Sequence, residues 1–165
     1  MSSTPSNSHV AELQEKIKSV RFAMLTTVDE NQHLISRPMT NQELDSEGNL
    51  WFFTSSTTDL SENIAVRPQV NVAFSEPAGH LYVSISGRAE RVNDPARIKA
   101  LWNAGAQAWF PNGPDDPTVT LIKVAPYAAE YWNSNGSAMV QLFRMAKAVL
   151  THTRPDGGEH GKIPL

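Results

Sequence analysis

The stretch QVNVAFSEPAGHLYVSISGRAERV, residues 69–92, reads as two β-strands joined by a turn. Apolar residues alternate with other residues in each half; they are Val70, Val72, Phe74, Leu81, Val83 and Ile85. A period of two residues is typical of a strand with one face on a core. Segment 76–79, EPAG, supplies the proline and glycine that favour a turn. The stretch therefore predicts an antiparallel hairpin, with Tyr82, Ser84 and Ser86 on the face away from the core.

Further strands are expected on both sides of this hairpin. RFAMLTTV, residues 21–28, is largely apolar on both faces, as in a strand that is covered on both sides. We expect a turn at DENQ after it and a returning strand at residues 33–40. Three more β-rich runs are LWFFT, TVTLIKVA and YAAEYW, at residues 50–54, 118–125 and 127–132.

Helical patterns occur between and beside these strands. A helix that begins near Ser8 carries an apolar stripe, formed by Val10, Leu13, Ile17 and Val20. Asp59 and Glu62 fit a capping pair for a short helix that ends before Pro68. Asp94 and the proline after it suit the start of a third helix.

Many short strands with helices inserted late favour an antiparallel barrel or sandwich with peripheral helices, in the mainly β, α+β class. The length of 165 residues suits one domain. We expect a polar, disordered leader at residues 1–7, a domain at 8–150 and a C-terminal tail at 151–165. The domain would end in an amphipathic helix at 137–150.

The composition narrows the classes of partner. The net charge is −3 and charged residues make up 19% of the chain, so no basic field is available for nucleic acid or anionic lipid. No apolar run approaches the roughly 20 residues that span a bilayer. Cysteine is absent, which excludes disulfides and thiolate chemistry. We expect a cytoplasmic protein with neither a nucleic-acid nor a membrane partner.

Familiar catalytic motifs are missing from the sequence. It contains no GxxxxGK[ST] loop, no strand-linked GxGxxG and no GxSxG elbow. The five histidines are scattered, and none has a partner at metal-ligand spacing. We therefore expect no metal site.

The segment ISRPMT, residues 35–40, places Arg37 and Pro38 inside an expected strand. Proline removes a ladder hydrogen bond, so Pro38 belongs at a sheet edge, at a bulge, or where the strand faces something other than a strand. Arg37 and the hydroxyl-rich segment TSSTT, residues 54–58, would suit a phosphate at the start of the next helix. The alternative is a polar turn beside a solvated edge charge, and the residues alone leave both interpretations open.

Seven segments occur in an order that resembles one family. They are LISRPMT, GNLWFFTSS, RPQVNVAFS, YVSISGRAERV, LWNAGAQAWFPNGPDDP, AEYWNS and GEHGKIPL. The sequence resembles the general stress protein branch of the pyridoxamine 5′-phosphate oxidase-like flavin-binding proteins over about residues 10–165. The resemblance implies a six-stranded split β-barrel and a homodimer that binds FMN, or alternatively FAD, in two grooves at the subunit interface.

The resemblance also implies which residues contact the flavin. Arg37 would reach the phosphate, and the backbone around Pro38 would face the edge of the isoalloxazine. The other implied contacts with ring or ribityl phosphate are Met39, Thr40, Phe53, Thr54, Ser55, Tyr82 and Trp132, with Trp109 and Phe110 closing the pocket from the partner subunit.

The sequence departs from the family pattern at two places. Leu60 stands where relatives carry a lysine that pairs with the phosphate. After Trp132 the chain reads WNSNGSAM and lacks the Arg-x-His element of the true oxidases. Oxidation of vitamin B6 is therefore not expected.

The leading hypothesis is an FMN-binding protein of the general stress type, acting as a flavin-dependent oxidoreductase on an unknown small molecule. No side chain is an evident acid or base, so no catalytic residue is named. One alternative is a stress protein that binds flavin or another ligand without turnover. Others are a split barrel adapted to haem or a deazaflavin, and a structural interaction protein without a ligand.

Overall fold

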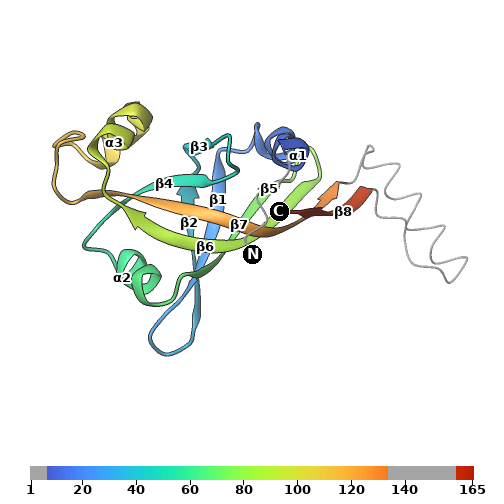
Figure 1. The fold of residues 1–165 in the computed structure, drawn as a ribbon, viewed down its shortest axis with the longest axis horizontal. Coiled ribbons are helices and arrows are strands. Elements are labelled where there is room, and N and C mark those ends of the chain that lie inside the picture. The colour runs from blue at the N-terminus through green and yellow to red at the C-terminus, as the bar shows by residue number, and fades with distance from the viewer. Residues whose placement is uncertain (1–6, 134–158) are drawn as a thin grey trace, which may run out of the picture.

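An antiparallel sheet of eight strands, curled into a half-open barrel, dominates the structure (Figure 1). The structure is a computed structural model that describes residues 7–133 and 159–165. Seven strands are hydrogen-bonded in the order β2-β1-β5-β6-β7-β4-β3, and β8 pairs with β7. Their bounds are β1 Phe22–Val28, β2 Leu34–Thr40, β3 Glu43–Leu44, β4 Leu50–Ser55, β5 Gln69–Glu76, β6 Leu81–Val92, β7 Val119–Asn133 and β8 Glu159–Pro164. The expected split barrel is confirmed.

The strand count is eight where six were expected. All six expected strands are present, because the runs 118–125 and 127–132 join into the single strand β7. Pro126 does not divide this strand, since it lies opposite Gly87 at a bulge, where a sheet tolerates proline. The two additional strands are β3, which is two residues long, and β8, which lies in the expected C-terminal tail.

Helices lie around the sheet (Figure 1). They are α1 Asn7–Ile17, α2 Asp59–Val66, α3 Pro95–Leu101 and α4 Ala104–Trp109. Asp94 caps α3 as expected, accepting hydrogen bonds from the backbone N–H groups of Ala96 and Arg97. The cap of α2 differs from expectation: Thr58 is the N-cap, because its hydroxyl reaches the N–H of Ser61 at 3.3 Å.

Helix α4 was not expected. The Asn103 side chain caps it, accepting from the Ala106 N–H at 3.0 Å. The expected helix at 137–150 lies outside the described residues. Of the helices described in 7–133, none combines the length and apolar character that a membrane crossing requires.

The main core fills the inside of the barrel. The helix α1 stripe is buried as predicted, with Leu13 and Ile17 contacting the sheet core. From the hairpin β5–β6, Val72 and Ile85 are fully buried, whereas Tyr82 is 44% exposed. A second, smaller cluster packs α3 against β4 and β7, around Trp51, Ile98, Val119 and Leu121.

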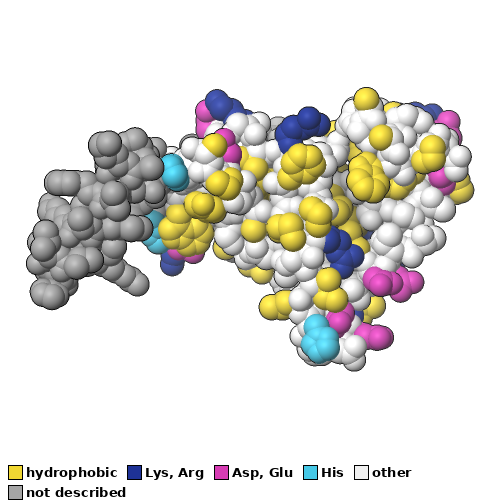
Figure 2. Space-filling model, turned by 180° about the vertical axis from the view of Figure 1, so that it is seen from behind, with side chains coloured by type: hydrophobic (Ala, Val, Ile, Leu, Met, Phe, Trp, Pro, Cys, Tyr) yellow, Lys and Arg dark blue, Asp and Glu magenta, His cyan; other side chains and the backbone are white. Residues whose placement is uncertain are grey.

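Strand β1 is covered on one side only, contrary to expectation. Ala23 and Leu25 are buried in the core, but Phe22 is 65% and Met24 43% exposed. These exposed residues belong to the outer face of the sheet, which we define as the side away from the main core. Figure 2 shows hydrophobic side chains spread over the middle of the molecule seen from behind. Alternation in the sequence reports two apolar faces but does not tell whether the chain itself covers both.

A polar network links the turn after β3 to the second cluster. Asp45 accepts hydrogen bonds from the indole of Trp51 at 2.8 Å and from the backbone N–H groups of Asn49 and Glu47. Arg97 lies over the Trp51 ring, 4.5 Å from its centroid, and pairs with Glu43. Burial raises the pKa of Asp45, but the hydrogen bonds from Trp51, Asn49 and Glu47 outweigh it, so the pKa is lowered overall.

Replacing Asp45 by asparagine is expected to lower the free energy of unfolding at pH 7 by about 1–3 kcal/mol, since bonds to a charged acceptor are lost. A pKa lowered by folding stabilises the protein above the unfolded value, and this contribution disappears as the pH falls below about 4. Urea unfolding of both proteins across pH 3–7 measures the difference, which should shrink at acidic pH. Asp115→Asn is the control, because Asp115 is exposed and should change stability little.

Candidate functional site

The outer face carries side chains in rows, because partner residues of antiparallel strands project to the same side. A central row crosses six strands from β2 to β8: Pro38, Met24, Ala73, Ser84, Glu130 and Lys162. An aromatic row lies two residues along these strands: Tyr82, Trp132 and His160. On the opposite side of the central row is a hydroxyl row: Ser36, Thr26, Asn71, Ser86 and Ala128.

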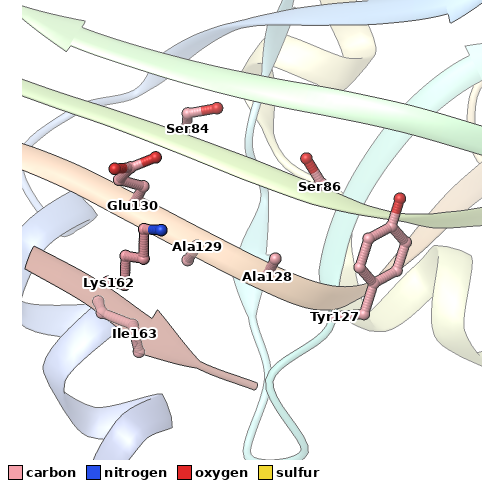
Figure 3. A pocket seen from close by; sticks show the side chains of 8 residues that line it. All are labelled: Ser84, Ser86, Tyr127, Ala128, Ala129, Glu130, Lys162 and Ile163. Carbon is pink, nitrogen blue, oxygen red and sulfur yellow. The ribbon is translucent and has the colours of Figure 1, made fainter.

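A groove of about 580 Å³ opens on this face where β6, β7 and β8 lie side by side (Figure 3). Its lining residues are Ser84, Ser86, Tyr127, Ala128, Ala129, Glu130, Lys162 and Ile163. In Figure 3, Tyr127 marks one end, and Glu130 and Lys162 lie toward the other. The volume falls in the range of small-molecule sites, about 300–1,000 Å³, and apolar and polar groups both line it.

A β-bulge builds the Tyr127 end of the groove. Ser86 pairs with Ala128, whereas Gly87 pairs with Pro126, so Tyr127 is an extra residue on β7. A bulge re-aims the side chain of such a residue. The Tyr127 hydroxyl donates a hydrogen bond to Gln69 Oε1 at 2.9 Å, which holds the half-exposed ring beside the groove.

The serines of the groove are oriented by one amide group. Asn71 Nδ2 donates to Ser84 Oγ at 2.9 Å and to Ser86 Oγ at 3.3 Å. Because the amide nitrogen only donates, both serine oxygens act as acceptors here and keep their own protons. The two hydroxyls can therefore donate to a molecule in the groove.

Charges gather at the opposite end. Glu130 Oε1 lies 2.6 Å from His160 Nε2, and the His160 ring stacks on Trp132 with centroids 5.2 Å apart and planes inclined by 11°. The Lys162 ammonium has neither a hydrogen bond nor an ion pair with any other described residue. The carboxylate is thus already engaged, while the ammonium remains available.

The structure divides the predicted flavin residues on β2 between the two faces. Pro38 and Thr40 lie on the outer face, opposite Met24 and Phe22. Met39 packs against the main core. Arg37 shares the inner face and is half-buried, and within residues 7–133 and 159–165 its guanidinium forms no hydrogen bond or ion pair.

Strand β2 lies at the edge of the sheet. A sheet edge is one of the three positions expected for Pro38, since proline lacks the N–H that a neighbouring strand would use. The edge leaves backbone groups of β2 without a neighbouring strand. A cation with no partner among the described residues therefore stands beside backbone donors and acceptors that a ligand could use.

The predicted hydroxyl segment forms a turn that leads into α2. Ser55 Oγ lies 2.9 Å from Thr57 Oγ1, and Thr54 Oγ1 lies 3.3 Å from Thr58 Oγ1. Thr54 is buried, and Thr58 also caps the helix. The hydroxyls of this turn therefore bond to one another and, through Thr58, to the first turn of α2.

The predicted aromatic contacts occupy two separate places. Phe53 and Phe110 belong to the second cluster, where the Phe53 ring meets Trp102 edge-on at 5.5 Å. Trp109, at the end of α4, is 82% exposed. Tyr82 and Trp132 are instead cross-strand partners in the aromatic row. The structure brings together Tyr82 with Trp132, and Phe53 with Phe110.

Leu60 has a packing role. It is 2% exposed and belongs to the main core together with Ile64. The apolar residue at this position therefore fills the barrel.

The groove residues Tyr127, Glu130, His160 and Lys162 were missed from the sequence. Strand alternation places Glu130 on the same face as Trp132, and that signal was available. The pairing of β8 with β7 joins residues about 30 positions apart, and no local pattern specifies it.

The described residues contain no group of three or more histidines and carboxylates that could hold a metal ion. Lowered pKa values occur at aspartates in turns: hydrogen bonds from the backbone of His33 lower the pKa of Asp29, and those from Thr118 lower the pKa of Asp116. These carboxyls bind turn backbone and do not line the groove.

Comparison with known proteins places this sheet in a family. A profile described as pyridoxamine 5′-phosphate oxidase like matches residues 8–156. The chain belongs to this family. The chain is also similar to the general stress FMN/FAD binding protein of Xanthomonas citri, with 32% identity and a TM-score of 0.66 over 80% of this chain and 93% of that one.

Two further similar proteins match more of the chain. A candidate general stress protein 26 from Jannaschia sp. CCS1 is 32% identical, with a TM-score of 0.72 over 94% of this chain and 97% of that one. Protein bli-3 of Neurospora crassa is 27% identical over 157 residues, which are 89% of this chain and 75% of that protein. The pyridoxamine 5′-phosphate oxidase-like split barrel thus extends over nearly the whole chain.

Gly87 is expected to be essential for the bulge. A Cβ at this position would lie 2.7 Å from the Ala125 carbonyl oxygen, so the Gly87→Ala variant must separate the β6 and β7 backbones. We expect a loss of about 1–3 kcal/mol in the free energy of unfolding, measured by urea denaturation. Ser84→Ala on the same strand is the control and should stay within about 0.5 kcal/mol of the wild type. Equal stability of the Gly87→Ala protein would contradict the close approach.

Proposed function

We propose that this protein is a cytoplasmic, homodimeric flavin-binding protein of the general stress type that binds FMN, with FAD as the alternative flavin. The observation that carries the proposal is the half-buried Arg37 guanidinium at a sheet edge, which is unpaired within the described part of the chain. Burying a cation without a partner is costly, so such a group is commonly completed by an anion. The flavin phosphate would be that anion.

The phosphate end of the site would combine Arg37 with Thr54 and Ser55. The turn that follows β4 supplies hydroxyls, and α2 directs backbone N–H groups toward its own start. The negative charge of Asp59 in the first turn of α2 opposes the attraction that the positive end of the helix would exert on a phosphate. Arg37 would therefore provide most of the attraction for the phosphate.

The ring end would use the edge of β2. The backbone at Pro38, Met39 and Thr40 lies along this edge, and Met39 would contribute through its backbone because its side chain packs on the core. Tyr82 and Trp132 offer exposed aromatic rings on the outer face, three and four strands away in the sheet order. With about 4.8 Å between strands, Tyr82 lies roughly 14 Å from β2.

This separation supports a site shared by two copies. One copy would hold the phosphate and ring edge through β2, and the aromatic row of the other would cover the ring. The outer face also leaves Phe22 and Met24 exposed, which a second copy would bury. Trp109, with Phe110 beside it, is the further partner contact that we propose, since the indole projects into solvent.

The bound flavin would supply hydride or single-electron transfer at N5, which no side chain can provide. The protein would bind the ring, orient it and exclude water from it. We propose an oxidoreductase, without a named substrate. A protein that binds flavin without turnover is the second candidate, because Leu60, a buried core residue, offers no charge to the flavin phosphate. Reduction of the bound flavin by NADPH faster than that of free flavin would exclude this second candidate.

Arg37→Ala is expected to weaken FMN binding by about tenfold to a hundredfold, because a charge-assisted contact is lost. Quenching of flavin fluorescence in a titration measures the dissociation constant. Arg91→Ala is the matched control, since Arg91 is an exposed arginine at the end of β6, and it should bind as the wild type does. Unchanged affinity in the Arg37→Ala protein, or no binding by the wild type, would refute the flavin site.

Phe22→Asp is expected to convert the dimer into a monomer, because a carboxylate would be buried between the two outer faces. Light scattering during size-exclusion chromatography measures the mass. Val66→Asp is the control, as Val66 is an equally exposed apolar residue on α2, 70% exposed against 65% for Phe22. A wild-type monomer, or a Phe22→Asp dimer, would contradict the shared site.

A further inference from the structure

We propose that His160 is a positioning residue for Trp132, so that the C-terminal strand β8 sets the orientation in which the indole meets the flavin ring. The inference rests on the proposed function, since it takes Trp132 to be a flavin contact, and it adds to that function a residue outside the predicted contacts. It is carried by bonds and ring contacts formed within one chain, not by open space on the outer face.

The His160 ring lies face to face with the Trp132 indole. The two residues are cross-strand partners on β8 and β7, which run side by side (Figure 1). Their ring centroids are 5.2 Å apart, and their planes are inclined by 11°. Flat conjugated rings favour offset stacking of this kind. One face of the indole is therefore taken by His160, and a flavin ring would use the other face or the outward edge.

A hydrogen bond fixes the plane of the imidazole. His160 Nε2 lies 2.6 Å from Glu130 Oε1. A carboxylate only accepts hydrogen bonds, so the imidazole N–H is the donor. Glu130 stands on the same face of β7 as Trp132, two residues earlier along the strand. The imidazole is thus bonded at its edge and stacked on its face, and both partners belong to the strand that carries the indole.

The core holds β8 in register with β7. Ile163 is 1% exposed and belongs to the main core. Gly161 lies against the buried ring of Tyr131, because a Cβ on Gly161 would come within 2.8 Å of that ring. Side chains alternate strictly along a strand, so a slip of one residue would turn Ile163 out of the core and His160 away from Trp132. The packing below the sheet therefore determines the stack above it.

Ordering the indole before the flavin arrives favours binding. Trp132 stands between His160 and its partner on β6, Tyr82. A side chain that is already held loses little rotational freedom when a ligand covers it, whereas a free side chain has to be immobilised. Immobilising one large side chain costs about twofold to tenfold in affinity. Loss of His160 should therefore weaken the contact of Trp132 with the flavin ring by a factor in this range.

Substitutions separate the stack from the hydrogen bond. His160→Phe keeps a ring over the indole without the bond to Glu130, His160→Gln keeps a donor without the ring, and His160→Ala removes both. Glu130→Ala leaves both rings in place and frees the imidazole, so it should act in the same direction as His160→Ala but more weakly. The control is His33→Ala, which removes an exposed histidine of the turn between β1 and β2.

The indole is observed first, in the full chain without flavin. Subtracting the emission of the matching Trp132→Phe protein isolates the fluorescence of Trp132 from that of the other tryptophans. We expect the anisotropy of this emission to fall in His160→Ala, because the indole gains rotational freedom, and to stay near the wild-type value in His160→Phe. Thermal unfolding of every variant establishes that the fold is intact.

Flavin binding is measured next, by fluorescence titration with FMN and with riboflavin, which lacks the phosphate. His160→Ala and His160→Gln should weaken both flavins equally, by about twofold to tenfold, because the affected contact is with the ring. His160→Phe should restore most of the affinity, and His33→Ala should bind as the wild type does. Arg37→Ala should weaken FMN alone, which separates the ring contact from the phosphate contact.

The outcomes distinguish this role from the flavin site itself. Wild-type affinity for both flavins in His160→Ala, or equal weakening in His160→Ala and His160→Phe, would overturn the role of His160 while the flavin site stands. Weakening of FMN alone by His160→Ala would also contradict it, because the ring is common to both flavins. A wild-type protein that binds no FMN would overturn the role of His160 together with the proposed function.

Discussion

The close approach of the β6 and β7 backbones at Gly87 is the constraint on which both faces of the sheet depend. It allows β7 to continue past Pro126 as one strand, so that its first half pairs with β4 and its second half with β8. Without this continuity, β4 and β8 would pair with two separate strands, both of them neighbours of β6. The strand that closes the barrel and the strand that borders the groove are therefore the same one.

The bulge also decides which side chains face the core. In the first half of β7 the residues on the main core have even numbers, such as Ile122 and Val124. After the extra residue Tyr127, the core residues are Ala129 and Tyr131. A regular strand would turn Glu130 inward and Tyr131 outward, because side-chain direction alternates strictly. One inserted residue thus keeps a carboxylate out of the core and places it at the groove.

Much of the fold follows from periodicity, and the exceptions have physical causes. The α1 stripe and the β5–β6 hairpin were predictable because each pattern is local and strong. The continuity of β7 was not, since a proline ordinarily ends a strand and the bulge depends on Gly87 in another strand. The covering of β1 was mispredicted, because an apolar face looks the same whether the chain or another molecule covers it.

The candidate site was predictable to a smaller extent. Arg37 stood out because a cation inside a strand is unusual, and its edge position agrees with that observation. The inward direction of Met39 was not recognised, because the resemblance assigned ring contacts by position and not by face. The groove was predictable only in part: alternation places Ser84, Ser86 and Glu130 on the outer face, but half of its polar end comes from β8, whose register is fixed only by pairing.

The side chains at the groove also oppose local strand stability. Central strands favour β-branched and aromatic residues, and the core side of β6 follows this preference with Val83 and Ile85. On the outer side of the same strands the chain instead carries Ser84, Ser86 and Ala128, whose small side chains bury little apolar surface. Larger residues would fill the hollow and strengthen the sheet, so the folding of a single chain does not explain these small side chains. Positions that break a local rule in an otherwise consistent strand are where a requirement for binding is expected.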